Sequence, residues 1–181
     1  MPFSQTSQEP WSILIDVATY IFPLDIFDGP MEDQATGSVT YVIASKSKFA
    51  GQTTTITHAD RSSVGTISWG SAANPMVVTL RGRTLPGNQM LVSTKPHIFA
   101  APKHAWKDDW GNEYFWKDGL CYDAKNQVIA RYTPAVLHTF RKARSATLSV
   151  VRTYDYLFDK ILFTALIVER MRRQGIMRKL S

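Results

Sequence analysis

One segment near the end of the chain limits most strongly what the sequence can fold into. It reads TYDYLFDKILFTALIVERMRRQG, and from Ile161 to Val168 every side chain except that of Thr164 is apolar. Charged residues flank this run on both sides, so its uninterrupted apolar part is only about 12 Å long as a helix. A membrane-spanning helix needs about 20 apolar residues. We therefore predict a helix over residues 155–173 that is buried inside the protein and does not span a membrane.

The chain between residues 39 and 151 reads as a succession of short strands. Runs rich in β-branched and aromatic side chains, such as VTYVIAS and VIARYT, alternate with Gly, Pro, Asn or Asp, a pattern typical of β-sandwiches and barrels. A helix that is apolar on every side must be surrounded by protein. The sequence therefore predicts a mainly β fold, a closed antiparallel barrel of about twelve strands around the buried C-terminal hydrophobic helix. The helix side chains expected to be almost fully buried are Ile161, Leu162, Phe163, Ala165, Leu166 and Val168.

Composition divides the chain into three parts. Residues 1–35 are expected to form a loosely ordered acidic arm, residues 36–175 the barrel with its helix over 155–173, and residues 176–181 a basic tail. The opening residues, MPFSQTSQEPW, lack the basic and apolar regions of a secretory signal. With a single cysteine, Cys121, and no Asn-x-Ser/Thr sequon, the sequence predicts an intracellular protein, either cytoplasmic or peripheral to a membrane.

Charge is unevenly distributed along the chain. Residues 1–40 carry six acids and no Lys or Arg, whereas residues 141–181 carry ten bases against three acids, within a net charge of +6. A basic region of this kind favours an anionic partner such as a membrane surface. The alternative is that the acidic start folds back on the basic end, and the sequence leaves both interpretations open.

Four stretches of the sequence resemble a known family. They are YVIASKSKFAGQTTTITHAD, VGTISWG, EYFWKDGLCYDAKNQVIARY and TLSVVRTYDYLFDKILFTALIVERMRR, and they cover most of residues 39–173. In this order they are similar to fungal tubby C-terminal-like proteins of unknown function, which are related in fold to tubby, LURP-one-related and phospholipid scramblase proteins. The resemblance implies a barrel around a hydrophobic helix, and binding of phosphoinositide headgroups by clustered Lys and Arg side chains.

Clustered bases are therefore the candidate ligand-binding residues. Arg81 and Arg83 are two positions apart and share a face if their strand continues, and the same holds for Lys142 and Arg144. Arginine binds phosphate oxygens in bidentate fashion, and each base near an anionic membrane adds about 1 kcal/mol. The alternative is that these are outward positions kept basic for solubility. The predicted lipid-headgroup residues are Arg81, Arg83, Arg141, Lys142 and Arg144.

An aromatic segment, HAWKDDWGNEYFW, follows a loop rich in proline and alanine. Tyr114 and Trp116 are expected to point into the barrel as strand residues. Trp106 and Trp110 are predicted to lie on a loop, where burial and exposure at a membrane interface are both open.

The residue types that carry chemistry do not form a recognised catalytic or metal-binding motif. The histidines are scattered without zinc-binding spacing, and neither a P-loop nor a dinucleotide-binding glycine motif occurs. We therefore predict no catalytic residue, no metal and no cofactor, and we do not expect a nucleic-acid partner. The sequence favours a non-enzymatic module that binds anionic phospholipid. A protein-interaction module, a scramblase-like protein and an enzyme are the alternatives.

Overall fold

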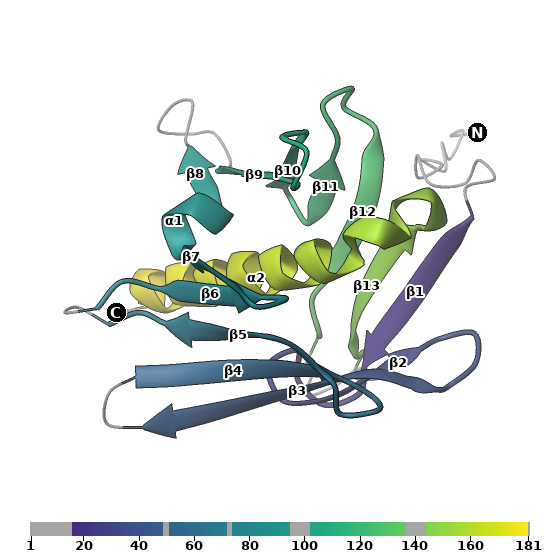
Figure 1. The fold of residues 1–181 in the computed structure, drawn as a ribbon, viewed down its shortest axis with the longest axis horizontal. Helices are drawn as coiled ribbons and strands as arrows, with labels where there is room; N and C mark the ends of the chain where they lie inside the picture. Colours follow the sequence, from purple (N-terminus) through teal and green to yellow (C-terminus); the bar gives the residue numbers. More distant parts are fainter. Residues whose placement is uncertain (1–15, 49–50, 72–73, 95–101, 137–143, 181) are drawn as a thin grey trace, which may run out of the picture.

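The computed structural model describes residues 16–48, 51–71, 74–94, 102–136 and 144–180 (Figure 1). Within these residues the chain forms one antiparallel sheet of 13 strands and a long C-terminal helix, which confirms the predicted mainly β fold. The strands are β1 (Val17–Phe22), β2 (Gly29–Asp33), β3 (Val39–Lys48), β4 (Gly51–His58), β5 (Ser63–Trp69), β6 (Val77–Leu80), β7 (Arg83–Pro86), β8 (Val92–Thr94), β9 (Lys103–Lys107), β10 (Glu113–Lys117), β11 (Leu120–Tyr122), β12 (Val128–Thr133) and β13 (Ala146–Val151). The helices are α1 (Gly87–Met90), the 3-10 helix η1 (Arg152–Leu157) and α2 (Phe158–Leu180).

The strand order joins the first and last strands in the middle of the sheet. Strands β2 to β7 extend from β1 on one side, and β12 to β8 extend from β13 on the other. The two halves are held together where β1 pairs with β13, from Val17 opposite Val151 to Phe22 opposite Ala146. The free edges are β7 and β8, which α1 connects along the chain. No ladder pairs β7 with β8 within the described ranges, so closure of the sheet into a barrel stays a prediction.

Alternation of side chains gives many of the strands one face toward a common core. In β13, Ala146, Leu148 and Val150 are buried, and the residues between them are partly exposed. In β10, Tyr114 and Trp116 are buried in the same alternating pattern. A period of two places such residues on one face of a strand, and the predicted inward orientation of Tyr114 and Trp116 is confirmed.

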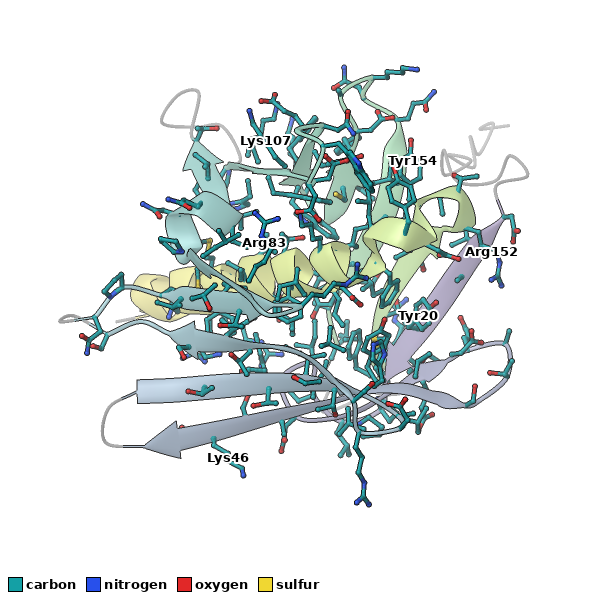
Figure 2. All side chains as sticks on the ribbon, viewed as in Figure 1. Tyr20, Lys46, Arg83, Lys107, Arg152 and Tyr154 are labelled. Atoms are coloured by element: carbon teal, nitrogen blue, oxygen red, sulfur yellow. The ribbon has the colours of Figure 1, made fainter. Side chains whose placement is uncertain are left out.

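Helix α2 runs between β4–β6 and β8–β12 (Figure 1), and side chains fill the space around it (Figure 2). From Ile161 to Ile167 every side chain is at most 1% exposed. Thr164, the polar residue of this run, accepts a hydrogen bond from Nε1 of Trp116 at 2.9 Å and donates one to the backbone oxygen of Lys160 at 2.8 Å. The prediction of an internal helix is confirmed, because solvent reaches no side of this segment.

The helix differs from its prediction at its two ends and at one core position. Residues Arg152–Leu157 form η1, so α2 begins at Phe158 and not at residue 155. It continues past Gly175 to Leu180, because glycine inside a helix costs only about 1 kcal/mol and does not by itself end it. Most of the predicted basic tail, 176–181, is therefore helical. Val168 is only partly buried, because it borders a pocket.

Residues 1–15 of the predicted loosely ordered arm, 1–35, lie outside the described residues, and the prediction is wrong for the rest of it. Strands β1 and β2 lie within it, and β1 pairs on both sides, with β2 and with β13. The stretch VATYIF alternates and supplies Ala18 and Phe22 to the core. Deleting residues 1–35 would therefore remove a strand from the middle of the sheet.

Candidate functional site

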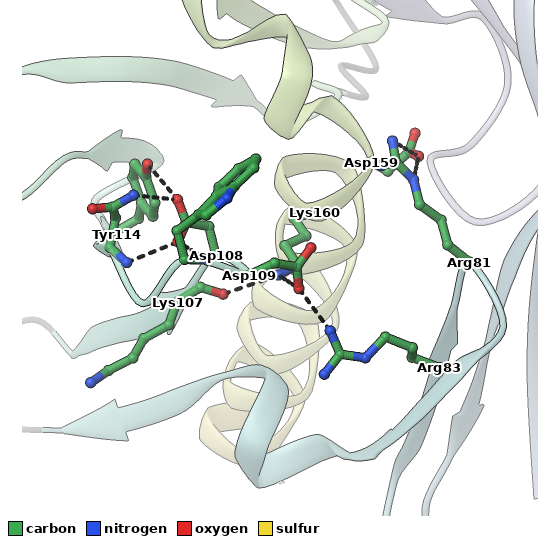
Figure 3. A network of polar contacts seen from close by, with 10 residues as sticks. Arg81, Arg83, Lys107, Asp108, Asp109, Tyr114, Asp159 and Lys160 are labelled. Carbon is green, nitrogen blue, oxygen red and sulfur yellow. Dashed lines mark hydrogen bonds and ion pairs between the residues drawn. The ribbon is translucent and has the colours of Figure 1, made fainter.

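The first two predicted ligand residues lie at the turn between β6 and β7. Leu80 pairs with Arg83 across this hairpin, and Arg81 and Gly82 between them have φ angles of 49° and 79°. Positive φ at both central positions is the geometry of a tight type I′ turn. Because Arg81 is a turn residue, the strand face that it was expected to share with Arg83 does not form. Both guanidinium groups nevertheless extend toward the start of α2 (Figure 3).

Asp159, in the first turn of α2, binds Arg81. Its Oδ2 accepts a hydrogen bond from Nε of Arg81 at 2.8 Å and lies 2.7 Å from Nη2. Its Oδ1 accepts a hydrogen bond from the Tyr41 hydroxyl at 2.9 Å. Burial, and then the charge of Asp159, raise the pKa of Tyr41, so this hydroxyl stays protonated and keeps donating. Protein groups therefore engage both oxygens of the Asp159 carboxylate.

Asp109, between β9 and β10, holds the second arginine. Its Oδ1 accepts hydrogen bonds from Nη1 of Arg83 at 3.1 Å and from Nζ of Lys160 at 2.9 Å (Figure 3). The hydrogen bond from Lys160, aided by the positive charges of Lys160 and Arg83, lowers the pKa of Asp109. This carboxylate therefore connects the β7 edge of the sheet with α2 and with the β9–β10 turn.

The lowered pKa of Asp109 predicts a pH-dependent contribution to stability. Its folded-state pKa lies below the ordinary value of 3.8, so the stabilisation is complete above that value and is lost as the pH falls through the folded-state pKa. Asp109→Asn should lower the free energy of unfolding at neutral pH by less than about 1 kcal/mol, because solvent screens most of the interaction at this exposed site. Thermal unfolding from about pH 7 to about pH 2 measures the difference from wild type. A difference that persists at the lowest pH would contradict this assignment.

These contacts leave little unpaired positive charge at the start of α2. Between the side chains lies a small pocket of about 90 Å³, whose lining includes Arg81, Arg83, Asp109 and Asp159. The charged side chains that line it are the bases Arg81, Arg83 and Lys160 and the acids Asp109 and Asp159. An anionic ligand would have to compete with carboxylates that already hold the arginines.

The aromatic segment is divided by the turn between β9 and β10. Trp106 belongs to β9, so the prediction that it lies on a loop is wrong. It is buried and stacks on Tyr114 with ring centroids 4.5 Å apart. Trp110 is 73% exposed, and its backbone N–H donates to the Asp108 carboxylate at 2.9 Å. Of the two tryptophans whose environment the sequence left open, one is therefore a core residue and the other a surface residue of an acidic turn.

The remaining predicted bases belong to the connection between β12 and β13. Arg144 is exposed and forms an isolated backbone bridge with Val136. Arg141 and Lys142 lie outside the described residues. Since β13 separates this connection from η1 and the start of α2, Arg144 is not brought together with Arg81 and Arg83.

The acidic start and the basic end of the chain meet beside this connection. Phe22 pairs with the first residue of β13, and Asp25, three positions later, binds Arg173 of α2 with 2.9 Å between Oδ2 and Nη1. Burial raises the pKa of Asp25, but the hydrogen bonds from Arg173 and from a backbone N–H outweigh it, so the pKa is lowered. Leu24, next to Asp25, is 75% exposed. This ion pair agrees with the alternative interpretation, in which the acidic start of the chain folds back on its basic end. It lies next to the exposed side chain of Leu24.

Glu169 binds two arginines in the second half of α2. At 1% exposure it is the least exposed carboxylate among the described residues. It accepts hydrogen bonds from Nε and Nη2 of Arg172 at 2.6 and 2.8 Å, and from Nε of Arg173 at 2.7 Å. Residues three and four positions apart share a helix face, so both arginines reach the same carboxylate. Glu169 thereby compensates part of the positive charge on this helix.

A larger pocket, which we call the helix pocket, lies between the second half of α2 and strands β8, β9, β10 and β12. Its volume is about 850 Å³. The apolar and aromatic side chains that line it are Pro102, Trp116, Tyr132, Pro134, Val168 and Met171. The polar side chains that line it are Ser93, His104, Lys117, Asp118, Glu169 and Arg172.

Two polar features stand out in the helix pocket. The Tyr132 hydroxyl is buried and has no hydrogen-bond partner among the described residues, and burial raises the pKa of Tyr132. His104 Nδ1 lies 2.7 Å from Oγ of Ser93, and burial lowers the pKa of His104, which favours a neutral imidazole. The pocket therefore offers a neutral Ser–His pair on largely apolar walls, while protein atoms enclose the Tyr132 hydroxyl.

The residues of these sites that sequence reasoning missed include Leu24, Tyr132 and Glu169. The Arg residues at positions three and four after Glu169 are a signal that could have identified it. Tyr132 follows the inward alternation of VIARYT, but its missing partner depends on neighbouring strands. Nothing in the local sequence marks Leu24 as exposed.

The described residues offer few further groups for chemistry. Cys121 is buried, and burial raises the pKa of its thiol, so it acts as the small core residue that the sequence indicated. Within the described ranges, no three His, Cys, Asp or Glu side chains are placed to hold a metal ion. In the same ranges, no helix is both long enough and apolar enough to cross a bilayer.

Comparison with known proteins gives one match. A family model described as a family of unknown function (DUF6593) matches residues 26–174. The match extends from the β1–β2 connection into the second half of α2, so it contains β2 to β13 and the lining residues of both pockets except Gly175. No curated protein and no solved structure matches the chain.

Proposed function

The chain belongs to DUF6593, a family of unknown function, and from this premise we propose that it is a non-enzymatic module that binds anionic phospholipid at a membrane surface. The observation that carries the proposal is the position of Leu24 and Arg144. Each lies two residues beyond the pair formed by Phe22 and Ala146 at one end of β1 and β13. An apolar side chain that enters the interface and a base that meets anionic headgroups are the two components of peripheral membrane binding.

The end of the molecule that carries the β9–β10 turn, opposite Leu24 and Arg144, is less suited to binding an anionic surface. Trp110 is exposed there, but its turn carries Asp108 and Asp109, and the nearby arginines are held by carboxylates. By contrast, the described residues offer Arg144 no ion-pair partner. The membrane-facing surface is therefore assigned to the end that carries Leu24 and Arg144.

The proposal includes the fold that the family resemblance implies. A closed, tubby C-terminal-like barrel is supported by the short connection through α1 between the free edges β7 and β8. It is also supported by the burial of α2 on every side from Ile161 to Ile167. In such a barrel, we expect Arg144 to bind phosphoinositide headgroups together with Arg141 and Lys142, the other predicted headgroup residues of this connection. Arg81 and Arg83 act mainly in ion pairs.

Vesicle sedimentation tests the membrane proposal. The full chain is mixed with vesicles of phosphatidylcholine alone, or of phosphatidylcholine with phosphatidylserine or a phosphoinositide, at low and at high salt. We expect binding to the anionic vesicles only, and weaker binding as salt screens the charges. Arg144→Gln should weaken partitioning about fivefold, since one base near an anionic surface contributes about 1 kcal/mol. Leu24→Ala should also weaken it, at either salt concentration.

Arg83→Gln is the matched control, because it removes the same charge at the other end of the molecule. Its partitioning should stay within about twofold of wild type, since the base that it removes lies far from the proposed surface. A protein that ignores anionic vesicles at low salt would refute the proposal. Equal losses for Arg144→Gln and Arg83→Gln would assign binding to net charge and not to this surface.

A further inference from the structure

We propose that the aromatic side chains of the β9–β10 turn and of η1 form a docking site for a proline-rich segment of a partner protein. We call this site the aromatic patch and define it by Trp110, Tyr154 and Tyr156. Its turn contacts Lys160 in the first turn of α2, whereas the β1–β2 connection that carries Leu24 contacts Arg173, 13 residues further along the helix. The patch goes beyond the proposed membrane function, because it stays accessible while the other end of the molecule lies on a membrane.

The patch is a continuous surface of three rings. Trp110 is 73% exposed and Tyr156 52% exposed, and they are the aromatic members among the exposed large hydrophobic residues of the described ranges. Their rings meet edge to face, with centroids 6.0 Å apart, and Tyr154 stacks on Tyr156 at 6.3 Å. A single exposed apolar side chain is ordinary, but aromatic side chains that adjoin one another on a surface are typical of interaction sites.

Hydrogen bonds hold the patch in place before any partner binds. Oδ1 of Asp108 accepts hydrogen bonds from the backbone N–H groups of Trp110 at 2.9 Å and Asn112 at 2.8 Å, which fixes the turn. The Tyr154 hydroxyl donates to Oδ2 of Asp123 at 3.0 Å. Binding therefore orders few groups that were mobile before. Tryptophan and tyrosine are also the residue types that most often dominate the energy of an interface.

The small pocket at the start of α2 opens beside the patch, since Trp110 and Tyr156 both line it. Its volume of about 90 Å³ is well below that of small-molecule sites, about 300–1,000 Å³, so it suits one side chain of a larger partner. A proline ring fits such a space, because it is compact and apolar and has no rotamer entropy to lose. The apolar side chains that line the pocket are Leu80, Leu85, Met90 and Leu157.

The charges around the pocket favour an uncharged partner. Its charged lining residues are already joined in the ion pairs Arg81–Asp159, Arg83–Asp109 and Lys160–Asp109. A nucleic acid would have to displace these carboxylates, and it would also meet Asp108 beside Trp110. A neutral glycan could stack on Trp110, but its hydroxyl groups gain nothing from the apolar part of the pocket. A proline-rich segment needs no ion pair to break.

The hydrogen-bonding groups near the patch match the backbone of such a segment. The indole N–H of Trp110 makes no hydrogen bond with the described residues. No strand of the described sheet pairs with the outer edge of β7, the strand that brings Leu85 to the pocket. Both places offer N–H donors. A polyproline II segment has unpaired carbonyl acceptors, and proline has no N–H that needs a partner. Aromatic-lined grooves recognise proline-rich segments in this manner.

Isothermal titration calorimetry of the full chain with octaproline, acetylated and amidated at its ends, tests the patch. We expect binding, and Trp110→Ala should weaken it about tenfold or more, because a central tryptophan contributes much of the energy of an interface. Trp110→Phe keeps a ring without the indole N–H, and should weaken binding about threefold, the effect of one hydrogen bond. Since Trp110 is exposed, both variants should keep the wild-type circular dichroism spectrum.

Leu24→Ala is the matched control, because it also removes an exposed apolar side chain, at the other end of the molecule. It should bind octaproline like wild type although it binds vesicles more weakly. Trp110→Ala should show the reverse, with unchanged vesicle sedimentation and weaker octaproline binding. Failure of one assay therefore does not decide the other.

Three results would overturn the proposal. The first is no binding of octaproline at concentrations up to about 1 mM, the weak limit of a specific interaction. The second is equal affinity of wild type and Trp110→Ala for the peptide. The third is tighter binding of oligothymidylate or cellohexaose than of octaproline, because the patch would then recognise a nucleic acid or a glycan.

Discussion

Leu166→Asp should abolish the folded state of the protein. Leu166 is fully buried in the segment of α2 that the core encloses. Truncating a buried leucine to alanine already costs about 2–5 kcal/mol, and a carboxylate at this position would also lose its hydration without gaining a partner. Together these costs approach the whole free energy of unfolding of an ordinary domain, about 5–15 kcal/mol. Circular dichroism and the soluble fraction after expression measure the effect.

Leu24→Asp is the control for this prediction. The substitution is the same, but Leu24 is 75% exposed in the β1–β2 connection, so the new carboxylate stays hydrated. This variant should be soluble and should keep the wild-type spectrum. If Leu166→Asp behaved in the same way, the enclosure of α2 would be wrong, and the barrel proposed from it would lose its support.

Glu169→Gln should lower the free energy of unfolding by roughly 2–4 kcal/mol. Removing one partner of a buried ion pair typically costs about 3–5 kcal/mol, and here three arginine N–H groups bind one carboxylate at 1% exposure. The cost falls below the top of that range because Arg172 and Arg173 are partly exposed and can regain water. Urea unfolding followed by tryptophan fluorescence gives the value.

Glu113→Gln is the matched control for the buried carboxylate. Glu113 forms an ion pair with Lys107 at 2.9 Å, but both side chains are mostly exposed, and such pairs contribute little to stability. The urea midpoint of this variant should therefore match wild type. Equal midpoints for Glu113→Gln and Glu169→Gln would mean that burial of Glu169 has no energetic consequence.

The internal helix could be predicted because its signal is local. Residues 161–167 are apolar with one threonine, and no soluble surface accommodates that pattern. The role of β1 could not be predicted in the same way. Its pairing with β13 joins residues that are far apart along the chain, such as Thr19 and Ser149, which are separated by 130 positions. The stretch VATYIF alone does not identify its partner, so residues 16–35 resembled a loose arm.

The candidate sites were predicted less well, because they depend on contacts between distant segments. Arg81 and Arg83 do come together, but the sequence did not show that Asp159 and Asp109 would hold them. Gly82 after Arg81 is a turn signal that could have shown that the strand ends there. The helix pocket has no linear signature, since its lining comes from four strands and α2.

The order of elements along the chain has a consequence for biosynthesis. Helix α2 is translated after the thirteen strands of the described sheet, and β13, which joins the two halves of that sheet, is the last of these strands. Until α2 has emerged from the ribosome, the inner faces of the strands have nothing to cover them. The core can therefore close only after α2 has left the exit tunnel. Messages truncated before α2 would yield chains that chaperones retain and proteases degrade.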